Sequence, residues 1–475
     1  MWYISAGPSP GQTTTSTVGE WALMSYFGRV NYDYKSRYLL EANLRYDGSS
    51  RLHPDGRWGL FPSVSGGWRL SEEEFFDVDV VNNLKIRGSW GKGGNYGSNN
   101  YQYQAMLTGA GDKLTSSYNF GGKATQLFYS DQMANDKIKW ETSITSNVGI
   151  DFGLFNSKLY GSVDYFIKNT EDIIRKLQVP SFVGIDGPNV NRGKMRNRGW
   201  EFELGHDNKI GDFRYSVKFN LDAYKNKLVS FGRKEPDGVN LRQEGLPYNT
   251  YYVLIQDGVY QNQEEIDNGP TPAYAGSVKL KPGDIKFKDI SGPDGVPDGI
   301  IDATYDRAPV QGVFPKFNYG FNLSAFYKGF DFNAFFQGVQ GRKLYVNSWG
   351  ITPFNQAAAP PVFWRDAWDG EGTSNYITHI YINGYVPMQE NWSSFFLRDA
   401  SYLRMKNIQL CYTVPARITQ RVYIQDLRIY ISGDNLLTFT KFFKGQIDPE
   451  RTTQGSSDAI YPQAKIFTMG LKVTF

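Results

Sequence analysis

The 475-residue sequence contains a single cysteine, Cys411, and only three histidines, His53, His206 and His379. One cysteine excludes an internal disulfide framework and a cysteine-based metal site. The three histidines are far apart in the sequence, and none belongs to a metal-binding or catalytic-triad motif. The sequence therefore offers no catalytic constellation, and we expect a protein that is not an enzyme.

Long apolar runs and a strong net charge are also lacking. No segment approaches the run of about 18 or more apolar residues that a membrane helix requires. The net charge is only +3, and basic residues are scattered among acidic ones, which argues against a nucleic-acid groove. Residues 1–21 show no basic segment followed by an apolar one, so no export signal is visible. A membrane protein with such a sequence has to cross with strands.

Alternation of apolar and polar side chains is the pattern that is present. In residues 25–46, tyrosines and small or aliphatic residues take nearly all even positions, and polar or charged residues take most odd ones. Successive side chains of a strand point to opposite faces, so this predicts a hairpin with one apolar face. A three-residue loop, 35–37, keeps that face in phase. The predicted facing pairs are Tyr34 with Tyr38, Tyr32 with Leu40, Val30 with Ala42, Gly28 with Leu44, and Tyr26 with Tyr46.

Tyrosines at both ends of this hairpin and aliphatic residues in its middle are typical of the lipid-facing surface of a membrane barrel. A soluble sandwich with one buried face gives the same alternation in a single hairpin. The alternation recurs along the whole chain, and this repetition favours the barrel. Near Asn407 the apolar residues move from one set of alternate positions to the other, which predicts a β-bulge there. The alternating segments are 25–34, 38–46, 58–70, 84–92, 140–152, 159–168, 199–204, 213–224, 317–327, 330–338, 401–413, 427–436 and 464–475.

Connection lengths alternate between short and long along the chain, as they do between the two sides of an outer-membrane barrel. The short connections are expected on the periplasmic side. Long extracellular loops are predicted at 93–139, 225–315 and 340–398. We therefore expect a partial segment over 1–23 and one all-β domain over 24–475, a transmembrane antiparallel β-barrel in fold class.

Seven long stretches, in this order, resemble the C-terminal half of the SusC/RagA family of TonB-dependent outer-membrane transporters. The resemblance extends from about Met24 to Phe475. The stretches are NYDYKSRYLLEANLRYDGSSRL, RWGLFPSVSGGWRLSEEEFF, NLKIRGSWGKGGN, WETSITSNVGIDFGLFNSKLYGSVDYFIKNTEDII, GPNVNRGKMRNRGWEFEL, KPGDIKFKDI and LRDASYLRMKNIQLCYTVP.

The resemblance implies the C-terminal part of a 22-stranded barrel in the bacterial outer membrane. It implies uptake of an oligosaccharide or peptide with a SusD-like lipoprotein as a lid, driven by TonB-ExbB-ExbD. No plug domain, TonB box or signal peptide is visible in the sequence, so coupling to TonB would run through an N-terminal region that the chain lacks. Periodicity alone leaves an iron-siderophore receptor, a passive porin and a secreted soluble glycan-binding β-protein as alternatives.

Four aspartates lie at short intervals in the run FKDISGPDGVPDGIIDATYD. Ca²⁺ prefers several carboxylate and carbonyl oxygens from one tight turn, so Asp289, Asp294, Asp298 and Asp302 are candidate ligands of a structural Ca²⁺ ion. The spacing departs from the EF-hand pattern, and no other cofactor is indicated. The alternative is a cluster of Asx turns on the surface.

Several tryptophans lie in the predicted loop 340–398. Flat aromatic faces stack on sugar rings or peptide side chains, while carboxylates accept hydrogen bonds from a ligand. Packing within the loop, or contact with the lid protein, is the alternative role. The candidate ligand-binding residues are Trp349, Trp364, Trp368, Asp369 and Trp392.

Overall fold

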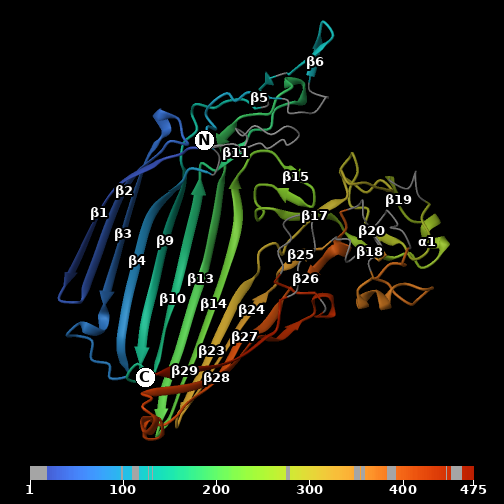
Figure 1. Cartoon of the computed structure of the whole chain (residues 1–475). Coiled ribbons are helices and arrows are strands. Elements are labelled where there is room, and N and C mark those ends of the chain that lie inside the picture. Colours follow the sequence, from blue (N-terminus) through green and yellow to red (C-terminus); the bar gives the residue numbers. More distant parts are fainter. Residues whose placement is uncertain are drawn as a thin grey trace.

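The computed structural model describes residues 19–97, 100–109, 117–126, 128–130, 132–273, 279–346, 353–354, 359–381, 392–445, 447–450 and 463–475. One antiparallel sheet of 13 strands dominates the described chain, and it is strongly curved (Figure 1). Its strands, in order across the sheet, are β1 (Leu23–Tyr34), β2 (Tyr38–Ser49), β3 (Trp58–Arg69), β4 (Val81–Asn95), β9 (Glu141–Leu154), β10 (Leu159–Glu171), β13 (Lys194–Ile210), β14 (Phe213–Ser230), β23 (Phe317–Tyr327), β24 (Phe330–Gln340), β27 (Tyr402–Thr413), β28 (Asp426–Thr440) and β29 (Ile466–Thr474).

The first hairpin has the register that the alternation predicts. Tyr34 faces Tyr38, Val30 faces Ala42, and Tyr26 faces Tyr46. The apolar face that results is exposed, and Val30 in its middle has 68% of its surface accessible. Rings gather at both ends of the hairpin, where Tyr46 stacks on Trp58 and Tyr38 stacks on Trp68. An apolar band between two aromatic rows is the outer surface of a membrane barrel.

The predicted bulge also occurs in the structure. On β24, the consecutive residues Phe335 and Phe336 pair with Asn407 and Met405, so Lys406 is the extra residue of β27 against that strand. The extra residue restores the apolar positions to one face after the change of phase in the sequence. No helix within the described ranges combines the length and the apolar character needed to span a membrane.

The long connections lie at one end of the sheet and form small elements of their own (Figure 1). The buried side chains of the connections after β14, β24 and β28 form one shared core, which includes Phe287, Phe363, Phe395 and Phe442. The small strands are β5 (Thr108–Gly109), β6 (Ser117–Phe120), β7 (Lys123–Gln126), β8 (Phe128–Tyr129), β11 (Ile174–Lys176), β12 (Asn189–Asn191), β15 (Glu235–Asp237), β16 (Asn240–Arg242), β17 (Thr250–Leu254), β18 (Gln256–Val259), β19 (Thr271–Pro272), β20 (Ile285–Phe287), β21 (Ile300–Ile301), β22 (Arg307–Val310), β25 (Lys343–Tyr345) and β26 (Leu397–Asp399).

Helical segments are short throughout the described residues. They are the α-helices α1 (Gln263–Asp267) and α3 (Ala416–Thr419), and the 3₁₀ turns η2 (Pro54–Gly56), η3 (Leu70–Glu72), η5 (Ser181–Val183), η8 (Val362–Asp366), η9 (Ser394–Phe396), η10 (Gln420–Val422) and η11 (Phe442–Gly445).

Candidate functional site

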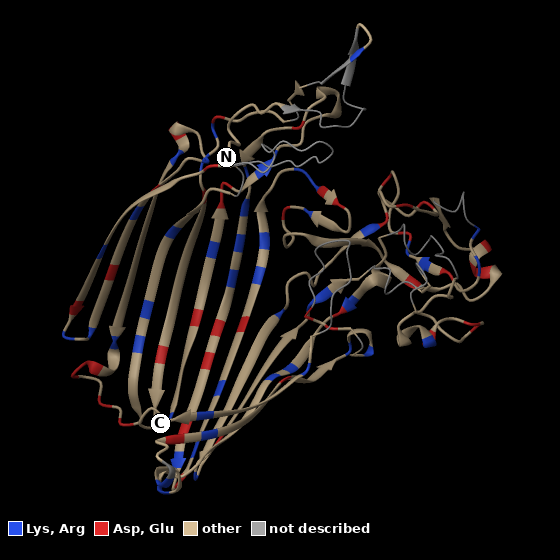
Figure 2. Cartoon of the chain, viewed as in Figure 1, with Lys and Arg blue, Asp and Glu red and all other residues tan. Residues whose placement is uncertain are grey.

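Acidic and basic residues lie along the strands of the sheet (Figure 2). On the face opposite the apolar one, some of them form ion pairs across neighbouring strands. Arg87 on β4 lies 2.9 Å from Asp151 on β9 and also binds Asp164 on β10, which is buried. Gly149 lies beside this pair, and a Cβ atom there would come within 2.8 Å of the Arg87 guanidinium carbon. A polar, ion-paired face opposite an apolar one fits a barrel whose interior is wet.

A cavity of about 810 Å³ lies at the loop end of the sheet, between three connections that are distant in sequence. We call it the loop cavity. The segments 129–130, 173–187 and 231–248 contribute its walls. Its volume lies within the range of about 300–1,000 Å³ that is usual for small-ligand sites.

Basic side chains predominate among the charged groups of the loop cavity. Arg175, Lys176, Arg233 and Arg242 line it, against only two carboxylates, Asp186 and Glu235. Arg175 pairs with Glu235 at 2.9 Å, and Lys176 pairs with Asp186. Arg242 pairs with Asp237 at 2.8 Å.

The connection that carries Phe231 and Arg233 is held by Glu244. One carboxylate oxygen of Glu244 accepts hydrogen bonds from the backbone N–H of Phe231, at 2.7 Å, and of Gly232, at 3.0 Å. The Gly232 and Phe231 N–H groups hold the pKa of the Glu244 carboxyl below its usual range, and Arg192 nearby adds to this. The charged form of Glu244 therefore fixes the wall of the loop cavity.

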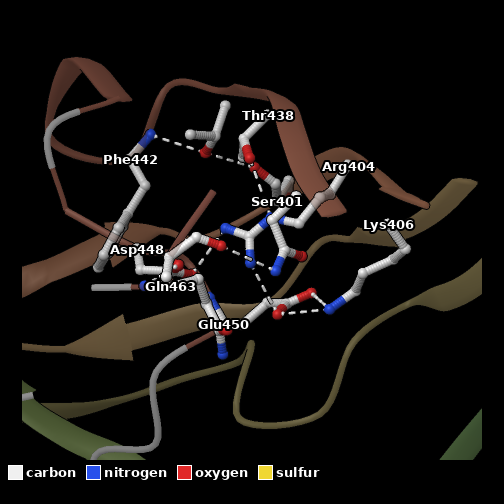
Figure 3. A network of polar contacts seen from close by, with 11 residues as sticks. Ser401, Arg404, Lys406, Thr438, Phe442, Asp448, Glu450 and Gln463 are labelled. Atoms are coloured by element: carbon white, nitrogen blue, oxygen red, sulfur yellow. Dashed lines mark hydrogen bonds and ion pairs between the residues drawn. The ribbon is translucent and has the colours of Figure 1, made fainter. Parts of the chain in front are cut away.

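A second polar network holds the connection after β28 against the sheet (Figure 3). Arg404 on β27 is 3% exposed and donates to Thr438, Asp448 and Glu450 at 2.8–2.9 Å. Lys406 lies 2.7 Å from the Glu450 carboxylate. Each side-chain nitrogen of Arg404 has an acceptor, so this buried cation is satisfied.

The predicted tryptophan site is not assembled as one surface. Trp364 is 2% exposed and packs on Phe363 and Phe395, so its assignment to ligand stacking is wrong and the alternative of loop packing holds. Both of its faces are covered because η8 lies in the shared core of the long connections. Trp349 lies outside the described residues.

The other predicted ligand-binding residues lie apart in the structure. The Trp368 indole donates to the Gln261 side chain at 3.2 Å, and Asp369 is exposed in the turn that follows. Trp392 packs in a separate cluster, where the Arg307 guanidinium lies 4.2 Å from its ring centroid. Trp368, Asp369 and Trp392 therefore stay predictions as ligand contacts.

Three of the four aspartates of the predicted Ca²⁺ site accept hydrogen bonds from backbone N–H groups of the same segment. Asp289 accepts from the Gly299 N–H at 2.7 Å, and Asp298 accepts from the Ile300 N–H at 2.9 Å. Asp302 accepts from the Tyr305 N–H at 2.9 Å. Among the described residues, no group of three or more His, Cys, Asp or Glu side chains could hold a metal. The Asx-turn alternative describes the bonds of Asp298 and Asp302, and the Ca²⁺ site stays a prediction.

Sequence reasoning missed the groups that organise this region and the loop cavity. Asp306 is fully buried and accepts from the N–H groups of Ile290, Ser291 and Asp302. Arg175 and Arg233 were not singled out either. No spacing signal could have found them, because the walls of the loop cavity come from segments with no periodicity of their own.

The comparison with known families decides the identity of this chain. The family model described as TonB dependent receptor-like, beta-barrel matches residues 2–280, more than half of the chain. The chain belongs to this family. TonB-dependent receptor P3 of Formosa agariphila is 31% identical over 97% of this chain and 46% of its own length. TonB-dependent receptor SusC of Bacteroides thetaiotaomicron is 28% identical over 95% of this chain and 44% of its own length.

A solved structure agrees with the TonB-dependent receptor fold. The structure of the RagAB peptide transporter matches with a TM-score of 0.79 at 23% identity, over 99% of this chain and 50% of that one. The likeness confirms the predicted all-β barrel fold. This TonB-dependent receptor chain spans about half the length of the curated relatives it matches.

Proposed function

We propose that this chain forms the barrel wall and outer loops of a TonB-dependent transporter that imports a nutrient ligand across the bacterial outer membrane. The observation that carries the proposal is the two-faced sheet, apolar and ringed by aromatics outside and ion-paired inside, in a chain of the TonB-dependent receptor family. Such a sheet is stable where one face meets lipid and the other meets water. The barrel therefore forms the path across the membrane, and the long loops form its extracellular entrance.

The ligand class that we propose is an oligosaccharide or a peptide. The loop cavity has the size of a small-ligand site, and it lies at the end of the sheet where long connections gather. The relatives include TonB-dependent receptor SusC, and the solved structure that matches is that of the RagAB peptide transporter. By likeness to them, a SusD-like surface lipoprotein is the proposed partner, and TonB-ExbB-ExbD the proposed energy source.

Deletion of the gene in its host tests this proposal. The deleted strain should lose growth on one oligosaccharide or peptide source, and deletion of tonB or of a neighbouring SusD-like gene should cause the same loss. Reintroducing the intact gene is the control. The ligand itself is identified by the nutrient on which growth fails.

The alternatives predict different outcomes of the same experiment. A growth defect confined to iron-limited medium would identify a siderophore receptor. Growth that depends on the gene but not on tonB would identify a passive porin. Recovery of the full-length protein in the soluble fraction without detergent would identify a secreted glycan-binding protein, and would end the transporter proposal.

A further inference from the structure

We propose that the loop cavity binds an oxyanion of the ligand, either a carboxylate or a sulfate group. The inference rests on the proposed function, because it names the chemistry of the ligand that the transporter would admit. It is argued from the side chains of the loop cavity.

The charges that line the loop cavity do not balance. Lys176 has its carboxylate, Asp186, inside the cavity wall, and Arg242 has Asp237 beside it. Within the described residues, Arg233 has no carboxylate partner, and its guanidinium binds only the neutral Gln178 side chain, with Nε 3.0 Å from the amide oxygen. Arg233 is exposed on the wall, so its positive charge is available to an anion.

Arg175 adds a second guanidinium to the wall of the loop cavity. Its side chain is 13% exposed and binds Glu235 through Nη2, whereas its Nε and Nη1 are buried and find no acceptor among the described residues. Its guanidinium carbon lies 3.8 Å from the centroid of the Phe231 ring, which fixes the plane of the group. Both bidentate faces of a guanidinium include Nη2, which Glu235 occupies here, and Nε and Nη1 are covered, so Arg175 contributes a fixed positive charge to the wall while Arg233 offers the accessible donors.

The remaining wall suits the body of such a ligand. Tyr129 and Tyr248 line the loop cavity together with aliphatic side chains such as Val179 and Ile185. Aromatic and aliphatic surfaces bind the uncharged part of a ligand, and the arginines give selectivity for its charge. A neutral ligand would leave the same guanidinium donors without partners.

Binding to the purified full-length protein in detergent tests the inference without any transport step. The probes are trigalacturonate and triglutamate, with maltotriose and trialanine as their neutral counterparts, and isothermal titration calorimetry measures the dissociation constants. We expect an acidic probe to bind at least tenfold more tightly than its neutral counterpart. If trigalacturonate binds more tightly than triglutamate, the oxyanion is carried on a sugar, and the reverse order indicates a peptide. Sodium sulfate and sodium acetate are then compared as competitors of the tighter probe, and the stronger competitor shows which oxyanion the loop cavity prefers.

Substitutions place that binding in the loop cavity. Arg233→Gln should weaken the tighter acidic probe about tenfold, and Arg233→Lys should weaken it less because the charge is kept. Arg175→Lys keeps the charge and a partner for Glu235, and it tests whether the planar guanidinium held on Phe231 contributes to binding. Arg417→Gln, an exposed arginine in α3 beyond the short-turn end of the sheet, is the control with the same change of charge and should have no effect.

The inference fails if neither acidic probe binds at millimolar concentration, or if the neutral counterparts bind equally well. It also fails if Arg233→Gln and Arg175→Lys both leave the affinity within twofold of the parent. Such a failure would leave the transporter proposal intact, because growth and TonB dependence test that proposal separately. Unchanged growth of the deleted strain on every oligosaccharide and peptide source, with anion binding still observed, would refute the transporter proposal alone.

Discussion

A positive charge on the apolar face of β1 should destabilise the protein in a membrane, whereas the same charge on the next residue should not. Val30 lies four residues from Tyr26 and four from Tyr34, at the centre of the exposed apolar face. Four residues span about 13 Å along a strand, or about 10 Å along the membrane normal at a tilt of about 40°. Val30 is therefore near the midplane of the bilayer.

The cost follows from that depth. An arginine on the lipid face near the midplane costs about 2–4 kcal/mol. Asn31 provides the matched control, because it is on the opposite face of the same strand and pairs with Glu41, whose carboxylate already binds Arg29. Asn31→Arg should therefore change the free energy of unfolding by less than about 0.5 kcal/mol.

Urea unfolding of the full-length protein in lipid vesicles, followed by tryptophan fluorescence, measures both variants. Heat-modifiable migration on gels shows whether each variant folds at all. If Val30→Arg and Asn31→Arg cost the same, the assignment of the even positions of residues 26–46 to lipid is wrong. A cost for Asn31→Arg alone would reverse the two faces.

Three further changes test other parts of the structure. Arg404→Met should lower the free energy of unfolding by about 3–5 kcal/mol, because it leaves the Asp448 and Glu450 carboxylates without their buried partner. Urea titrations measure this variant beside Lys406→Met, and equal effects of the two substitutions would contradict the prediction. The Glu244 pKa is lowered in the folded protein, so its stabilisation of the 231–232 backbone is present above the ordinary pKa and is lost as the pH falls through the folded value. Hydrogen–deuterium exchange over 228–246, corrected for intrinsic rates, should rise on acidification in the parent, and Glu244→Gln should show the raised exchange already at neutral pH. If Ca²⁺ binds the 289–302 turns, plasma emission analysis of the purified protein will find it in the parent and not in the double variant Asp294→Ala, Asp298→Ala; a parent without stoichiometric Ca²⁺ would end that prediction.

The strands were predictable because their signal is local. A strand alternates with a period of two residues, so burial on one face is visible in the sequence without knowledge of any partner. The three-residue turn at 35–37, the pairing of Val30 with Ala42 and the bulge near Asn407 all follow from keeping that alternation in phase. The 13 alternating segments correspond to the 13 strands of the sheet.

The long connections were not predictable in the same way, because they have no period and their contacts join distant segments. Trp364 and Trp368 look alike in the sequence, yet only the shared core of three connections decides that Trp364 is buried. Arg404 meets its carboxylates 44 and 46 residues away.

The sequence by itself determined the strands, the register of the first hairpin and its apolar face, because each of these depends on neighbours along one strand or across one short turn. Only the tertiary structure decided which charges meet at the loop end. It brings Arg175, Glu235 and Arg233 together from two connections separated by the whole of β13 and β14. Because such a site depends on how connections pack against each other, the side chains of the loop cavity became visible only with the fold.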